Sequence, residues 1–192
     1  MKHYIELTIL PDLETPLFFL WEKVYQQLHL SLVERQTNYG KVNVCIAFPE
    51  YNIEKHQLGS KLRLVSSSKE ELESLNINQW LSRLNDYLHI TAICDIPEKI
   101  ESHVFFNRIQ PKNNNARLAR RMVKRKGISY EEALLHYQSR EESMSKLPFI
   151  NMKSQSTNNK FRLFIEKSES DKKVTGSFNS YGLSKTTTVP WF

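Results

Sequence analysis

The sequence predicts an α+β fold with an N-terminal ferredoxin-like domain, and three observations predict it. Residues 3–10 read HYIELTIL, where β-branched residues and alternation are typical of a strand. The elements up to residue 97 follow the order β-α-β-β-α-β of the split βαβ motif, so we expect one sheet with two helices on one face. The first helix is predicted over residues 17–32 by apolar side chains at helical spacing, namely Leu17, Leu20, Trp21, Val24, Leu28 and Leu32.

Two strands are expected after the first helix. The turn residues Asn38, Tyr39 and Gly40 precede KVNVCIAF at residues 41–48, which we expect to be the second strand. KLRLV at residues 61–65 follows a polar connection, and its alternation predicts the third strand.

A second helix and a fourth strand complete this domain. Ser68 with Glu71 three residues later fits a capping box, which predicts a helix start. The helix is expected to break near residues 76–78 and then to resume. HITAIC at residues 89–94 predicts the fourth strand, and the Pro97 segment that follows marks a boundary. We therefore expect a first domain at residues 1–97.

Residues 98–192 are expected to form a smaller C-terminal α/β domain with a basic helix. Gly127 suits the C-terminal end of that helix, and Ser129 with Glu132 predicts the start of another. The expected order is an extended segment at 102–110, the basic helix at 115–126, a second helix from Ser129, a charged connection at 138–146 and a β-rich region from Leu147.

Composition narrows the class of protein. The 192 residues are 40% hydrophobic and 11% aromatic, which is enough for a packed core. We find no apolar run near the roughly 20 residues that span a bilayer and no signal peptide, so we expect a cytoplasmic protein. Cys45 and Cys94 resemble core residues of strands. Since metal-binding motifs and phosphate-binding glycine loops are also missing, we expect no metal and no nucleotide cofactor.

The positive charge of the chain is concentrated in one stretch, Arg108–Lys126. It holds eight of the 27 basic residues and no acidic one, so the rest of the chain has 19 basic against 21 acidic residues. A local excess of this kind predicts a polyanionic partner.

The spacing within this stretch predicts an amphipathic helix. One arc is basic, and the opposite arc carries Leu118, Ala119, Met122 and Val123. A solvated charged face is one interpretation, although such faces usually contain Glu and Asp. A membrane-surface helix is another, although its apolar face would be deeper. We favour nucleic acid as the ligand of the basic arc, which consists of Arg117, Arg120, Arg121, Lys124 and Arg125.

RNA allows catalysis without a metal, because its 2′-hydroxyl is a built-in nucleophile that needs alignment and a proton acceptor. His29 follows the apolar stripe of the first helix, near its expected C-terminus, where the helix dipole favours imidazolium. It also fits a structural histidine that makes one hydrogen bond. Ser154, Ser156 and Thr157 suit phosphate binding, but they also fit an ordinary polar loop.

Several blocks of sequence indicate a family. KSQSTNNKFRLFI, starting at Lys153, is followed by NSYGLSK and a terminal VPWF, and NRIQ precedes the basic helix. HYIEL, LHLSL and FPE match near the front. With these blocks, essentially the whole chain resembles the type I-F CRISPR-associated repeat endoribonucleases, which process precursor CRISPR RNA.

The resemblance implies a fold and an activity. The N-terminal domain would be ferredoxin-like, and the arginine-rich helix would lie in the major groove of the repeat stem-loop. Cleavage at the base of the stem would use the 2′-hydroxyl without a metal, giving a 2′,3′-cyclic phosphate and a 5′-hydroxyl. If the affinity resides in the stem, upstream of the cut, cleavage removes few contacts, so we expect the protein to stay bound to the mature guide RNA. Its further partners would be other subunits of a type I-F surveillance complex.

The resemblance also implies roles for individual residues. His29 matches the catalytic histidine, Ser154 the serine that holds the nucleophilic ribose, and Tyr181 the tyrosine that orients the site. The RNA-binding residues it implies are Arg108 and Gln110, which read base edges, Ser156 and Thr157, which contact phosphate, and Phe161, which stacks on the terminal base pair. Ala119 and Lys124 depart from the family pattern, because arginines are expected there.

Two alternatives stay open. One is a non-catalytic RNA-hairpin-binding subunit of a ribonucleoprotein complex, in which the active site has decayed. The other is a DNA-binding regulator, which would share the salt dependence but would not prefer RNA.

Overall fold

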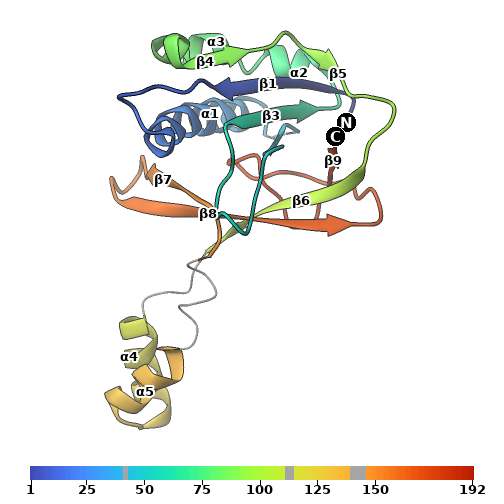
Figure 1. Cartoon of the computed structure of the whole chain (residues 1–192). Helices are drawn as coiled ribbons and strands as arrows, with labels where there is room; N and C mark the ends of the chain where they lie inside the picture. Colours follow the sequence, from blue (N-terminus) through green and yellow to red (C-terminus); the bar gives the residue numbers. More distant parts are fainter. Residues whose placement is uncertain (41–42, 111–114, 139–145) are drawn as a thin grey trace.

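Two antiparallel sheets with a long helix between them form the body of the protein in Figure 1, the computed structural model. The structure describes residues 1–40, 43–110, 115–138 and 146–192. Helix α1 (Leu17–Tyr39) packs on both sheets, through contacts with β1 and β7. The first and last strands end close together, and the rings of Tyr4 and Phe192 are in edge contact, with their centroids 5.1 Å apart.

The first sheet has the ferredoxin-like strand order that the sequence predicts. β1 lies between β3 and β4, and every neighbouring pair is antiparallel. In register, Ile5 faces Leu64 and Leu7 faces Leu62, so alternate residues of these two strands enter the core. The strands, in spatial order, are β2 (Cys45–Ala47), β3 (Lys61–Ser66), β1 (His3–Ile9) and β4 (Leu88–Ile90).

The predicted fourth strand is broken in two, which corrects the expectation of one strand over residues 89–94. β4 ends at Ile90, and β5 (Cys94–Asp95) pairs with the other end of β1. At the break, the hydroxyl of Thr91 accepts a hydrogen bond from Glu6 N at 3.0 Å. A side chain thus takes the place of a ladder carbonyl and interrupts the strand.

The helices of this half are also close to the prediction. α1 continues seven residues past Leu32 and ends at Gly40, whose φ of 74° is left-handed. The second helix forms three short pieces, and Ser68 caps the first of them by accepting from Glu71 N. These pieces are α2 (Lys69–Glu73), α3 (Ile77–Trp80) and the 3₁₀ helix η1 (Ser82–Tyr87).

The second sheet is built from the C-terminal half. Its spatial order is β7 (Phe149–Lys153), β8 (Lys160–Ser170), β6 (Ser102–Ile109) and β9 (Val189–Trp191). Buried side chains of both sheets belong to one hydrophobic cluster. The boundary near residue 97 therefore stays a prediction, since the two halves share a core.

Residues 171–188 contain no strand, which corrects the expectation of a β-rich region over the whole C-terminal part. Hydroxyl groups accept several of the backbone N–H bonds there. Thr188 Oγ1 accepts from Val174 N at 2.9 Å, and Ser184 Oγ accepts from Thr187 N at 3.2 Å. Such local bonds compete with strand pairing.

The basic helix forms as predicted, as α4 (Asn115–Lys126), and packs against α5 (Tyr130–Gln138). The two helices lie apart from the sheets in Figure 1. Ala119, Met122 and Ala133 are buried between them. The hydroxyl of Ser129 accepts from Glu132 N at 3.1 Å, as the capping pattern predicts. Most of the charged connection expected at 138–146 lies outside the described residues.

Candidate active site and RNA-binding surface

His29 lies in the middle of α1, and one of its ring nitrogens donates a hydrogen bond to a backbone carbonyl. Its Nδ1 is 2.8 Å from the carbonyl oxygen of Ser180. Because a carbonyl can only accept, Nδ1 carries the proton, and in the neutral ring Nε2 keeps the lone pair. The prediction that His29 lies near a helix C-terminus is wrong, because α1 continues for ten residues to Tyr39.

The electrostatic setting of His29 also differs from that prediction. Burial lowers the pKa of the imidazole, and the Arg108 guanidinium lowers it further, while the Ser180 hydrogen bond acts in the opposite direction. The net effect is a lowered pKa of His29. His29 is therefore biased toward the neutral ring, which is the form that takes up a proton.

Tyr181 covers the His29 ring. The two rings are parallel, with their centroids 4.2 Å apart. The backbone carbonyl of Tyr181 accepts a hydrogen bond from the Tyr25 hydroxyl at 2.8 Å. Tyr25 is one helical turn before His29, and its burial raises its pKa, so it stays a neutral donor. One face of α1 thus holds both the histidine and the loop that stacks on it.

The loop that carries Tyr181 is fixed to the first sheet. Asn179 Oδ1 accepts from the backbone N–H groups of Tyr181 and Leu183, at 2.9 and 3.2 Å. Gly182 has a φ of 68°, and its carbonyl accepts from Ile46 N at 2.8 Å. A Cβ atom at Gly182 would lie 2.6 Å from Ile46 Cγ1, so only glycine fits.

Arg108 and Phe161 complete the group that we call the His29 cluster (His29, Tyr181, Arg108 and Phe161). Arg108 Cζ lies 4.6 Å from the centre of the Tyr181 ring and 5.4 Å from that of Phe161. The Phe161 and Tyr181 rings meet edge to face at 6.5 Å. Within the described parts of the chain, Arg108 has no carboxylate partner, so its N–H donors are available to a ligand.

Ser154 starts a tight turn after β7, which we call the serine turn (residues 154–159). Its backbone N–H donates to Asn159 O, and its carbonyl accepts from Asn158 N, both at 2.9 Å. Its hydroxyl lies 3.2 Å from Ser156 Oγ and accepts from Thr157 N at 3.3 Å. The turn therefore groups three hydroxyl side chains, with those of Ser156 and Thr157 exposed.

The turn is joined to α1 by a residue that the sequence did not single out. Lys153 N donates to Gln26 Oε1 at 3.1 Å. Gln26 lies three residues before His29, so the two side chains are neighbours on α1. Tyr25 and Gln26 belong to none of the motifs, but helical spacing from His29 was a usable signal for both. Ser180 lies in the NSYGLSK block, next to Tyr181, but the sequence did not assign it a role.

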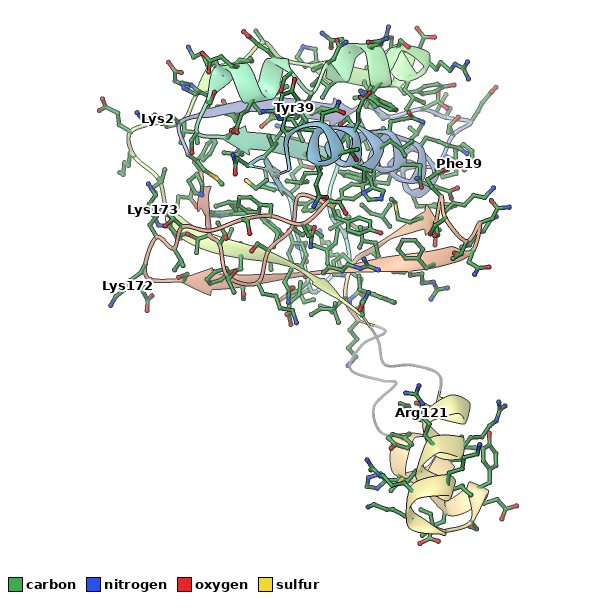
Figure 2. All side chains as sticks on the ribbon, turned by 180° about the vertical axis from the view of Figure 1, so that it is seen from behind. Lys2, Phe19, Tyr39, Arg121, Lys172 and Lys173 are labelled. Atoms are coloured by element: carbon green, nitrogen blue, oxygen red, sulfur yellow. The ribbon has the colours of Figure 1, made fainter. Side chains whose placement is uncertain are left out.

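The basic surface lies on α4. Ala119, Met122 and partly Val123 face α5, while the basic side chains point to solvent. Arg121 is labelled in Figure 2, on the helix pair that lies apart from the body of the protein. The buried position of Ala119 explains one departure from the family pattern, because an arginine there would face α5. The exposed basic residues are Arg120, Arg121, Lys124, Arg125 and Lys126. The Arg117 side chain lies outside the described part.

Gln110 follows β6 and is exposed, two residues after Arg108. Arg108 is thus still paired with Ile165 of β8, near the end of β6, and Gln110 is the first residue past the strand, on the side of the chain that leads to α4. Figure 1 shows β6 running from the chain termini to this point.

Among the residues that the structure describes, no group of three or more His, Cys, Asp or Glu side chains is arranged to hold a metal ion. No helix in the same residues is long and apolar enough to cross a membrane.

Comparisons with known proteins identify the family. The family model for the CRISPR-associated protein Cas_Csy4 matches residues 4–192. The CRISPR-associated endonuclease Cas6/Csy4 of Escherichia coli (strain UTI89 / UPEC) is 36% identical over 193 residues, and that of Pseudomonas aeruginosa (strain UCBPP-PA14) is 34% identical over 195 residues. Both matches cover 100% of each chain.

Two solved structures are more distant. One, described as a Cas6-related gene product from Pyrococcus furiosus, has a TM-score of 0.36 and 14% identity, covering 99% of this chain and 98% of that one. The other, a RAMP protein binding different RNA substrates, has a TM-score of 0.31 and 12% identity, covering 98% and 99%. The family model and the two full-length relatives carry the assignment, and this chain belongs to the Csy4 family of CRISPR-associated proteins, the type I-F group that its sequence resembles.

Proposed function

We propose that this protein is an endoribonuclease that binds the hairpin of CRISPR repeat RNA and cleaves precursor CRISPR RNA at the base of the stem. The observation that carries the proposal is the state of His29. Its Nδ1 is fixed by Ser180 O, its ring is stacked on Tyr181, and its pKa is lowered by burial. A neutral imidazole with a free Nε2 is a suitable general base at neutral pH.

The reaction is a transesterification within the RNA. His29 Nε2 takes the proton of the 2′-hydroxyl as the 2′-oxygen attacks the adjacent phosphorus. The bond between phosphorus and the 5′-oxygen breaks, which leaves a 2′,3′-cyclic phosphate and a 5′-hydroxyl after the leaving oxygen gains a proton. In this proposal no metal is needed, because the nucleophile is part of the substrate and alignment supplies much of the rate.

The neighbouring residues have positioning roles. We propose that Ser154 holds the nucleophilic ribose, since its hydroxyl belongs to a turn that is bonded to α1 through Lys153. Tyr181 would keep the His29 ring in its orientation by stacking on it. Ser156 and Thr157 are exposed next to Ser154 and would donate to phosphate oxygens.

Recognition is assigned to other groups. Arg108 and Gln110 would read the lowest base pairs, because Arg bonds bidentately to guanine and Gln to adenine. Phe161 would stack on the terminal base pair. The basic residues of α4, including Arg117, would contact stem phosphates. A helix enters an A-form major groove only where a short stem ends and the groove opens.

The product is expected to stay bound, because the stem contacts lie on one side of the cut and survive it. This retention would leave the protein on the mature guide RNA, where other subunits of a type I-F complex would meet it. Turnover with excess substrate is therefore expected to be poor.

The test uses two RNAs in EDTA: a cognate repeat, and the same RNA with 2′-deoxy at the cleavage position. We expect cleavage of the all-ribose RNA alone. Binding without cleavage of either RNA would favour the non-catalytic hairpin-binding subunit. Equal affinity for duplex DNA would favour a DNA-binding regulator.

A further inference from the structure

The Gln26 carboxamide connects the helix that carries His29 with the strand that leads into the serine turn. Its Oε1 accepts the Lys153 backbone N–H at 3.1 Å. β7 is an edge strand of the second sheet, and among the residues that the structure describes it pairs with β8 alone. An edge strand presents N–H groups that no neighbouring strand can accept, and Gln26 supplies the acceptor for this one.

The orientation of the carboxamide follows from its partner. A backbone N–H can only donate, so the atom facing Lys153 must be the oxygen. The amide nitrogen, Nε2, is then buried and has no hydrogen-bond partner in the described parts of the chain. Burying an unpaired donor costs free energy that offsets the gain from the Lys153 bond. Stability alone therefore gives little reason for a glutamine at this position.

Geometry gives a better reason. Gln26 and His29 are three residues apart on one face of α1, and Ser154 directly follows Lys153 in the chain. The serine turn is closed by its own backbone bonds between Ser154, Asn158 and Asn159, so it forms one hydrogen-bonded unit. One hydrogen bond thus fixes this unit to the helix segment that carries the histidine.

We propose that Gln26 is a positioning residue, which sets the distance between His29 and the Ser154 hydroxyl by holding Lys153 against α1. The proposal rests on the proposed function, in which Ser154 orients the ribose and His29 takes its proton. Gln26 acts through these two residues and touches no RNA, because its free nitrogen is buried. Losing the contact therefore slows cleavage while hairpin affinity is kept.

Three variants test this role. Gln26→Met removes the acceptor at similar volume, Gln26→Glu keeps an oxygen in its place, and Gln36→Met is the matched control, an exposed glutamine on the same helix. We expect Gln26→Met to slow single-turnover cleavage by about 10- to 100-fold, as small misplacements do, with affinity within threefold. Gln26→Glu should cleave at least threefold faster than Gln26→Met, and Gln36→Met should match the wild type.

A second measurement does not depend on cleavage. Hydrogen exchange of the Lys153 amide should be faster in Gln26→Met than in the wild type and the Gln36→Met control. If the wild type fails to cleave RNA, the proposed function fails, and the exchange rate still decides whether the contact holds the turn. Unchanged exchange, cleavage within twofold of wild type, or equal losses in Gln26→Met and Gln26→Glu would each overturn the positioning role.

Discussion

On α4, the five basic side chains that the structure describes are exposed, and few residues of this helix are buried. Around His29, in contrast, the rings are stacked and half-buried at fixed distances. Charge in solvent acts over about 8–10 Å at ordinary salt, so it tolerates errors of an ångström. Proton transfer needs atoms within hydrogen-bond reach. If α4 binds the RNA stem and His29 takes the proton, as we propose, then affinity and chemistry should respond separately to mutation.

The largest expected effect is on chemistry. His29→Ala removes the proposed base and should slow cleavage by about 10²- to 10⁴-fold, while hairpin affinity should stay within a few-fold, because in our proposal α4 makes the stem contacts. Single-turnover cleavage and equilibrium binding measure the two quantities. His89→Ala, an exposed histidine on β4, is the control. A large loss of hairpin affinity in His29→Ala would show that His29 is structural, and affinity and cleavage would then not be separable.

A pair of glycines compares how tightly the two regions are built. Gly182 and Gly127 both have a φ of 68°, but a Cβ at Gly182 would meet Ile46 at 2.6 Å, while nothing lies within 4 Å at Gly127. Gly127→Ala should cost about 1 kcal/mol of unfolding free energy from backbone strain. Gly182→Ala should cost about 3 kcal/mol, because overpacking adds to that strain.

Urea unfolding followed by circular dichroism measures both losses. Equal losses would mean that the loop of Tyr181 relaxes away from β2, contrary to the tight docking described above.

Affinity should respond to α4. Arg121→Ala should weaken hairpin binding several-fold and lower the salt slope by about one phosphate contact, with the cleavage rate at saturating protein unchanged. Arg83→Ala, an exposed arginine on η1, should change neither. An unchanged salt slope in Arg121→Ala would remove this residue from the RNA interface.

The sequence predicts local features well in both regions. The caps at Ser68 and Ser129 and the helix at residues 115–126 all depend on spacings of three or four residues, and all are confirmed. The setting of His29 depends instead on Ser180, 151 residues away in the chain. No periodicity encodes such a contact, and the helix end was misjudged because residues 33–39 are mostly polar. The resemblance supplied what spacing could not, and the roles of individual residues stay predictions.

The smallest expected effect is that of Arg108, a proposed RNA-binding residue, on the pKa of His29, the proposed base. Burial and the Arg108 cation both lower the pKa of His29, so NMR titration of the RNA-free protein should give a midpoint below the ordinary value of 6.5. Arg108→Met removes the cation but not the burial, so the midpoint should rise without reaching the ordinary value. Arg162→Met, an exposed arginine stacked on Phe149, should leave it unchanged.

The lowered pKa of His29 also makes the stability of the protein depend on pH. The folded protein binds the His29 proton less tightly than the unfolded chain does. The neutral ring therefore contributes to the free energy of unfolding above the ordinary pKa, and this contribution is lost as the pH falls through the pKa of His29 in the folded protein. Arg108→Met should therefore weaken this acid sensitivity. A midpoint that stays or falls in Arg108→Met would mean that the guanidinium does not act on His29, and recognition by Arg108 would then be independent of the base.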